Sequence, residues 1–75
     1  MIVMEEEIRD KVAKLIKNER IRQKITQEDL AYKSNVSCRY LSDIENGKAN
    51  FSFTTFLKVA LALNLSALDL LQFYK

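Results

Sequence analysis

The residues from 37 to 43 carry polar side chains suited to hydrogen bonding, and their spacing predicts that they share the outer face of one short helix. Arg39 offers a planar fork of N–H donors that matches O6 and N7 of guanine, and the carboxylate of Asp43 can accept a hydrogen bond from the amino group of cytosine. This pattern is typical of a helix whose N-terminal side chains contact base edges in a DNA major groove. The exposed positions expected near that end are Ser37, Cys38, Arg39, Ser42 and Asp43.

Other interpretations of three of these residues remain open. Arg39 can instead be a solvated side chain or a phosphate contact. Asp43 can instead repel wrong base sequences, or hold Arg39 in place from one helical turn away. Cys38 at a helix N-terminus is a candidate redox sensor, but the chain has no second cysteine to resolve an oxidised thiol. A small side chain that packs against a base is therefore the favoured interpretation of Cys38.

The composition argues against most catalytic and metal-binding chemistry. The 75 residues include no histidine, one cysteine and one glycine, so we expect no zinc site, no disulfide within the chain and no glycine-rich phosphate loop. No nucleophile with a nearby base is evident, so we do not expect an enzyme. We also expect no cofactor and no small-molecule ligand.

Charge and hydropathy are those of a soluble protein with a modest basic excess. The formal net charge is +2, and between Arg9 and Lys48 ten Lys or Arg residues stand against six Asp or Glu residues, an excess of four. A solvated surface can show the same excess, so charge alone does not decide between DNA binding and a bland surface. No apolar run reaches the roughly 18 residues of a membrane span, and the N-terminus lacks the basic region of a signal peptide. We therefore expect a cytoplasmic protein.

Helix signals run through the whole chain, and we predict an all-α, compact five-helix fold that forms a single domain over residues 1–75. The first helix is expected from about Glu5 to Gln23, with apolar residues three and four positions apart. The fourth, "FTTFLKVALALN", is apolar nearly all round, so we expect it at the centre of the core. The fifth is expected over about residues 66–74. Hydroxyl side chains are the expected N-caps of the second to fifth helices: Thr26, Ser37, Ser52 and Ser66.

The second and third helices are separated by about three residues, which is the spacing of a helix-turn-helix over about residues 27–45. Asn35 tolerates the left-handed backbone of the turn, and Gly47 supplies the left-handed position after the third helix. Ala31 is small where the two helices cross. The apolar contacts of the crossing are expected from Leu30, Val36, Leu41 and Ile44.

The stretch "TQEDLAYKSNVSCRYLSDIENGK" resembles the phage repressor and Cro helix-turn-helix family, also called the xenobiotic-response-element family. Within it, "TQEDLAYKSN" followed by Tyr-aliphatic-Ser-x-Ile-Glu is similar to the controller proteins of restriction–modification systems. The resemblance covers roughly Ile16 to Leu71 and implies a five-helix domain that binds an inverted-repeat operator as a homodimer. Asn35 replaces the usual turn glycine, and the loop "NGKANFS" lacks the proline often found there. The alternatives are a phage-type repressor and an antitoxin-like module whose main partner is a protein.

A second group of residues is expected to contact the DNA backbone rather than the bases. Gln27 stands at the first turn of the second helix, where its amide and nearby backbone N–H groups can bind a phosphate. A surface glutamine with no partner is the alternative. The resemblance supports the phosphate contact, and the full set comprises Thr26, Gln27, Tyr40, Asn46, Lys48 and Asn50.

Two further predictions concern assembly. Arg20 continues the apolar stripe of the first helix, so it points inward and needs a buried carboxylate, for which Glu45 is the natural partner. The resemblance implies such a structural ion pair, and two unrelated surface charges are the alternative. The fifth helix carries more apolar residues than one buried face needs, which indicates a homodimer interface with Leu68, Leu71 and Phe73 as the expected contacts. The alternative is that all of its apolar residues pack under the first helix.

Overall fold

The computed structural model describes residues 6–65, and within that range the chain forms four α-helices and no strand. They are α1 (Glu6–Arg22), α2 (Gln27–Ser34), α3 (Cys38–Glu45) and α4 (Phe53–Ala62). The fifth predicted helix, over about residues 66–74, lies outside the described residues, as do its capping residue Ser66 and the expected interface residues Leu68, Leu71 and Phe73. The all-α class is confirmed. None of the described helices is long and apolar enough to cross a membrane.

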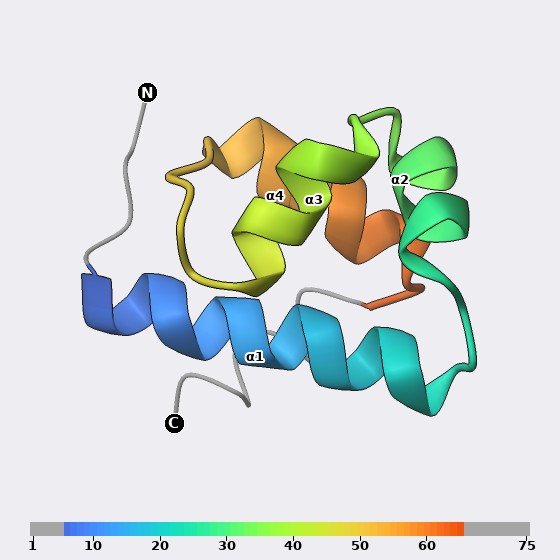
Figure 1. The fold of residues 1–75 in the computed structure, drawn as a ribbon, viewed down its shortest axis with the longest axis horizontal. Helices are drawn as coiled ribbons and strands as arrows, with labels where there is room; N and C mark the ends of the chain where they lie inside the picture. Colours follow the sequence, from blue (N-terminus) through green and yellow to red (C-terminus); the bar gives the residue numbers. More distant parts are fainter. Residues whose placement is uncertain (1–5, 66–75) are drawn as a thin grey trace.

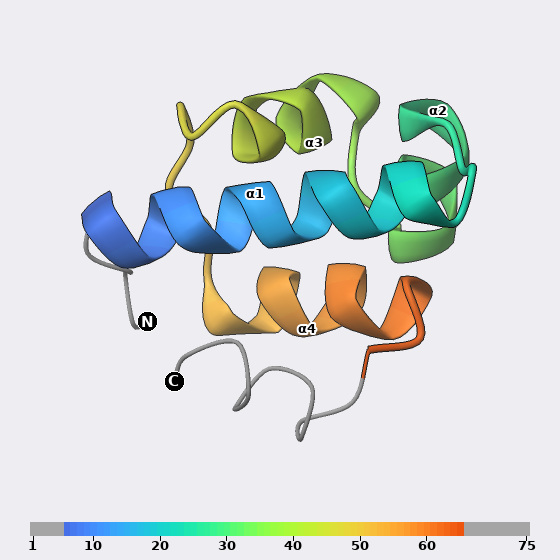
Figure 2. The ribbon, with the colours of Figure 1, turned by 90° about the horizontal axis from the view of Figure 1, so that it is seen from below.

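The long helix α1 forms a base along which the shorter helices are arranged (Figures 1 and 2). It packs against α3, while α2 packs against both α3 and α4. Figure 2 shows α1 in front, with α3 along one side of it and α4 along the other. The most deeply buried residues of the shared core are at most 1% exposed, with one or two contributed by each helix or helix end: Ile16, Leu30, Leu41, Ile44, Val59 and Leu63. At about 1.5–3 kcal/mol for each buried aliphatic side chain, this cluster supplies much of the folding free energy.

The N-termini of three helices are capped as the sequence predicts. The side chains of Thr26, Ser37 and Ser52 each accept a hydrogen bond from the backbone N–H three residues later, at 3.0–3.1 Å. All three caps have extended backbone angles, which turn the side-chain oxygen back over the first helical turn. The Ser52 hydroxyl also donates to Thr55 Oγ1 at 3.1 Å, whereas the hydroxyl hydrogens of Thr26 and Ser37 remain available as donors.

Every described helix is followed, within two residues of its end, by a residue with positive φ. Asn35 (φ 59°) and Gly47 (φ 70°) follow α2 and α3, as expected, whereas Lys24 (φ 59°) and Asn64 (φ 60°) after α1 and α4 were not predicted. After α3 the backbone N–H of Lys48 donates to the carbonyl of Asp43 at 2.9 Å, which closes the helix. The turn between α2 and α3 is therefore made by Asn in place of glycine.

The fourth helix contributes to the core as expected, but it is buried on one side only. Its buried face carries Phe56 and Val59, but Phe53, Leu57 and Leu61 are 54%, 39% and 70% exposed. These three residues are four positions apart, so they form one stripe along the helix. The reason is geometric, because within residues 6–65 the neighbours of α4 pack against one side of it only.

Candidate nucleic-acid interface

The predicted base-reading residues lie on the outer side of α3. Ser37, Cys38 and Arg39 are exposed at its N-terminal end, and Ser42 and Asp43 follow one turn later as half-buried residues. The opposite side of the helix is completely buried through Leu41 and Ile44. The helix therefore offers its polar N-terminal side to an external partner while its apolar side fixes it to the domain.

Arg39 and Asp43 do not form an ion pair, although they are one helical turn apart. Ion pairs among the described residues involve other side chains. The alternative in which Asp43 holds Arg39 in place is therefore not realised, and the guanidinium of Arg39 keeps all its donors for a partner. Cys38 is a free, exposed thiol beside it.

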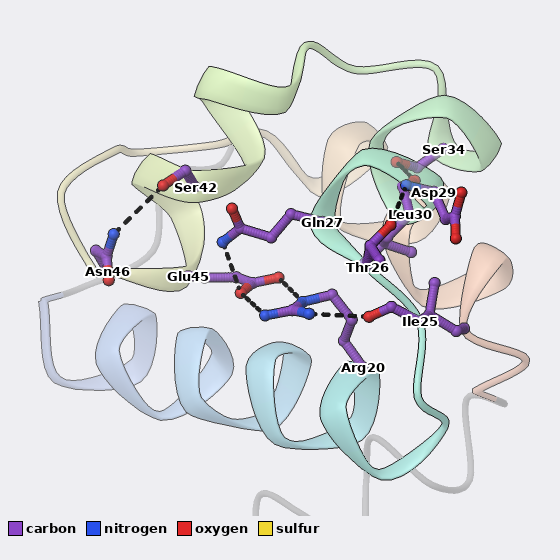
Figure 3. Close-up of polar contacts among 10 residues, drawn as sticks. All are labelled: Arg20, Ile25, Thr26, Gln27, Asp29, Leu30, Ser34, Ser42, Glu45 and Asn46. Carbon is purple, nitrogen blue, oxygen red and sulfur yellow. Dashed lines mark hydrogen bonds and ion pairs between the residues drawn. The ribbon is translucent and has the colours of Figure 1, made fainter.

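The orientation of α3 is set at its other end by a buried ion pair, which the sequence predicts and the structure contains (Figure 3). Arg20 Nε donates to Glu45 Oε2 at 2.8 Å, and Arg20 Nη2 donates to Glu45 Oε1 at 3.0 Å. The Glu45 side chain is 1% exposed and that of Arg20 is 13% exposed. Two parallel bonds between planar groups define both a distance and an angle, so α3 is held against α1 in one orientation.

The same two residues also engage the start of α2. Arg20 Nη1 donates to the backbone carbonyl of Ile25 at 2.9 Å, and Gln27 Nε2 donates to Glu45 Oε1 at 3.1 Å. Figure 3 shows the carboxylate of Glu45 between these two side chains. The sequence did not indicate that Gln27 has this partner. Its amide nitrogen carries a second hydrogen, so the predicted phosphate contact remains compatible with the observed position.

The segment after α3 carries the other predicted backbone contacts. Lys48 and Asn50 are exposed, and Asn46, also exposed, donates through Nδ2 to Ser42 Oγ at 3.5 Å. Tyr40 is half-buried, and its hydroxyl donates to the backbone carbonyl of Asn50 at 3.2 Å. Tyr40 therefore holds this segment against α3.

Arg9 is a residue of this region that sequence reasoning missed. Its Nη1 donates to Asn50 Oδ1 across 41 positions of sequence. The signal was present, because Arg9 shares with Arg20 the stripe of α1 that includes the buried residues Ala13 and Ile16. A charged residue at such a position needs a polar partner. The partner of Arg9 is the side-chain amide of a loop residue, and loop residues follow no regular spacing from which the pair could be predicted.

The helices α2 and α3 are joined by a short turn in which Asn35 has left-handed backbone angles. The second helix of the pair has a polar N-terminal side. This arrangement defines a helix-turn-helix protein. The chain belongs to a helix-turn-helix family, whose sequence pattern matches residues 16–70. It is similar to the control protein C.BamHI of Bacillus amyloliquefaciens, with 39% identity over 49 residues. That match covers 65% of this chain and 60% of the length of the relative.

Solved structures of controller proteins have the same fold. A point mutant of the restriction–modification controller protein C.Esp1396I matches with a TM-score of 0.83 and 32% identity, over 89% of this chain and 88% of that chain. The controller protein C.AhdI from Aeromonas hydrophila matches with a TM-score of 0.79 and 28% identity, over 85% of this chain and 97% of that chain. A C.Esp1396I tetramer in complex with its natural 35 base-pair operator matches with a TM-score of 0.77 and 32% identity, over 89% of this chain and 95% of that chain. The predicted resemblance to controller proteins is confirmed.

Proposed function

We propose that this chain is a sequence-specific DNA-binding regulator of transcription that controls a restriction–modification system. The observation that carries the proposal is the exposed polar start of α3, on a helix held in one orientation by the Arg20–Glu45 pair. The similarity to controller proteins supports it, because one of them has been solved on its natural operator. The proposal includes no enzymatic activity, no cofactor and no small-molecule ligand, and places the protein in the cytoplasm of a bacterium.

In the proposed interface, some residues contact base edges and others contact phosphates. The outer side of α3 reads base edges in the major groove, with Arg39 bound to guanine as the main contact. Phosphates are bound by donors on either side of this helix, at the start of α2 and in the segment after α3. The donors are supplied by Thr26, Gln27, Asn46, Lys48 and Asn50. Tyr40, the sixth residue of the expected set, has its hydroxyl hydrogen on the Asn50 carbonyl, so its part is to hold the segment in place.

A single module reads only a few base pairs, so the proposal requires two copies on an inverted repeat. A two-fold axis would place two α3 helices about 34 Å apart, which is one turn of B-DNA. The proposed contact between the copies is the fifth helix, with Leu68, Leu71 and Phe73. A dimer also makes DNA occupancy rise steeply with protein concentration, which suits a regulator without a ligand-binding domain.

The test begins with selection of the operator from random duplexes, followed by fluorescence anisotropy on the selected and on a scrambled duplex at several salt concentrations. Affinity should fall steeply as salt rises, because phosphate contacts release counterions. Arg39→Ala should weaken operator binding by about 1–3 kcal/mol and relax the preference at one base position. Gln27→Ala should weaken both duplexes alike, since phosphate contacts carry no base information.

Two results would count against the proposal. If the unchanged protein shows no salt-dependent affinity for any duplex but captures a protein partner tightly, it is an interaction module of the antitoxin-like kind. If Arg39→Ala weakens the operator and the scrambled duplex equally, Arg39 is a phosphate contact and another residue reads the base.

A further inference from the structure

We propose that Arg9, on α1, is a positioning residue for DNA binding, because it fixes the side-chain amide of Asn50 with its NH2 group turned outward toward the DNA backbone. This inference rests on the proposed function. It adds a residue far from the helix-turn-helix in sequence, and it explains why Asn50 presents donors rather than an acceptor to a phosphate.

The first observation is the contact itself. Arg9 Nη1 donates to Asn50 Oδ1, and the Nε of Arg9 is buried without a hydrogen-bond partner. This placement bonds the guanidinium to a loop residue in the predicted DNA-contacting segment.

The second observation concerns the polarity of the amide. A guanidinium has only donors, so the atom of Asn50 that faces Arg9 must be its oxygen. The Nδ2 group then points the other way, and within residues 6–65 neither of its hydrogens has a partner. Phosphate oxygens are acceptors, so an outward NH2 group is attractive to DNA and an outward carbonyl oxygen is repulsive. Arg9 thereby selects the flip state of Asn50 that favours binding.

The third observation is that the backbone of Asn50 is fixed as well. Its carbonyl accepts the Tyr40 hydroxyl at 3.2 Å, so Asn50 is held from α3 through its backbone and from α1 through its side chain. The segment after α3 starts directly over the N-terminal half of α1 (Figure 1). The approach is close, since a Cβ at Gly47 would lie 2.8 Å from Asp10 Oδ1. The start of α1 thus forms the support on which this segment rests.

The experiment is a double-mutant cycle between Arg9→Ala and Asn50→Ala, read as affinity for the selected operator and for a scrambled duplex by fluorescence anisotropy. Each single change should weaken both duplexes alike by about 2- to 10-fold, which is the effect of one ordinary hydrogen bond. The double variant should be no weaker than the weaker single variant. Lys14→Ala, which removes the same charge from an exposed position of α1, should show additive behaviour with Asn50→Ala.

Salt dependence separates positioning from direct contact. If Arg9 neutralised a phosphate, Arg9→Ala would reduce the slope of log affinity against log salt by about 0.9, and that result would overturn the proposal. An unchanged slope is expected. Additivity of Arg9→Ala and Asn50→Ala would also overturn it.

Asn50→Asp tests the polarity without removing Arg9. The aspartate keeps an oxygen for the guanidinium but replaces the outward NH2 group by an acceptor, so it should bind DNA more weakly than Asn50→Ala while Tm is maintained. Binding at least as tight as that of Asn50→Ala would refute the flip-state argument even if Arg9→Ala fails to fold. If the unchanged protein has no salt-dependent DNA affinity, the proposed function fails first, and that outcome is distinct from a failed cycle in a protein that binds.

Discussion

Removal of either partner of the Arg20–Glu45 pair should destabilise the domain far more than the loss of an ordinary surface contact. The Glu45 carboxylate is 1% exposed and accepts from two atoms of Arg20 and from Gln27. In Arg20→Ala, this carboxylate stays buried and keeps only the amide donor. In Glu45→Ala, the guanidinium keeps only its bond to the Ile25 carbonyl. Each variant therefore strands a charge in a place that water reaches poorly.

The expected loss is about 3–5 kcal/mol for either single change. A domain of this size has a total stability of roughly 4–11 kcal/mol, so the variants should be near the limit of folding. In thermal unfolding, the loss corresponds to a Tm decrease of at least roughly 12 °C. The burial of Glu45 is the reason for this magnitude, because an exposed pair is hydrated in both the folded and the unfolded state.

Urea and thermal unfolding followed by circular dichroism measure the loss, with Arg22→Ala as the matched control. Arg22 also pairs with a glutamate, Glu19, on the same helix, but its side chain is 69% exposed. The control should leave the midpoint nearly unchanged, since exposed pairs contribute little. If Arg20→Ala and Glu45→Ala each shift the midpoint no more than Arg22→Ala, and their effects add, the reasoning from burial is refuted.

Two further predictions concern the turns and the assembly. Gly47→Ala should destabilise the domain by roughly 1–2 kcal/mol, since a side chain at φ 70° is strained. Asn35→Gly should leave the urea midpoint nearly unchanged, because Asn and Gly both tolerate the left-handed conformation. Equal losses of stability in the two variants would contradict this explanation. Leu71→Glu should convert a dimer into a monomer in sedimentation at micromolar concentration, and a dimer that survives several charges along the fifth helix would exclude that interface.

The parts of the fold that could be predicted from sequence are those governed by local chemistry. Thr26, Ser37 and Ser52 cap helices because a hydroxyl placed before an apolar periodic segment has few other uses. Gly47 and Asn35 end helices because they tolerate positive φ. Lysine has no such preference. The left-handed turn at Lys24 is held by bonds between Arg20 and Ile25 on either side of it, so it could not be predicted from the residue type.

The contacts of the candidate site also divide into those that could be predicted from the sequence and those that could not. Arg20 needed a buried acid, and only a few acids lie at suitable places, so Glu45 could be named from sequence. Arg9 needed an acceptor too, but its partner is an amide in a loop without periodicity, and the path of that loop depends on the tertiary contact of Tyr40 with the Asn50 carbonyl. The exposed stripe of α4 was missed for a related reason, since hydropathy indicates that a helix is apolar but not which neighbours cover it.

The Arg20–Glu45 pair also allows stability to be separated from geometry. Replacement of both residues by apolar ones, as in Arg20→Met with Glu45→Leu, removes the stranded charge and should recover much of the lost stability. The apolar pair cannot supply directional bonds to the Ile25 carbonyl or to the Gln27 amide. The start of α2 and the end of α3 then lose their common anchor, so DNA affinity should stay reduced in a variant whose unfolding midpoint is close to that of the unchanged protein. Affinity that returns together with stability would show that the pair only avoids a buried lone charge and does not orient the recognition helix.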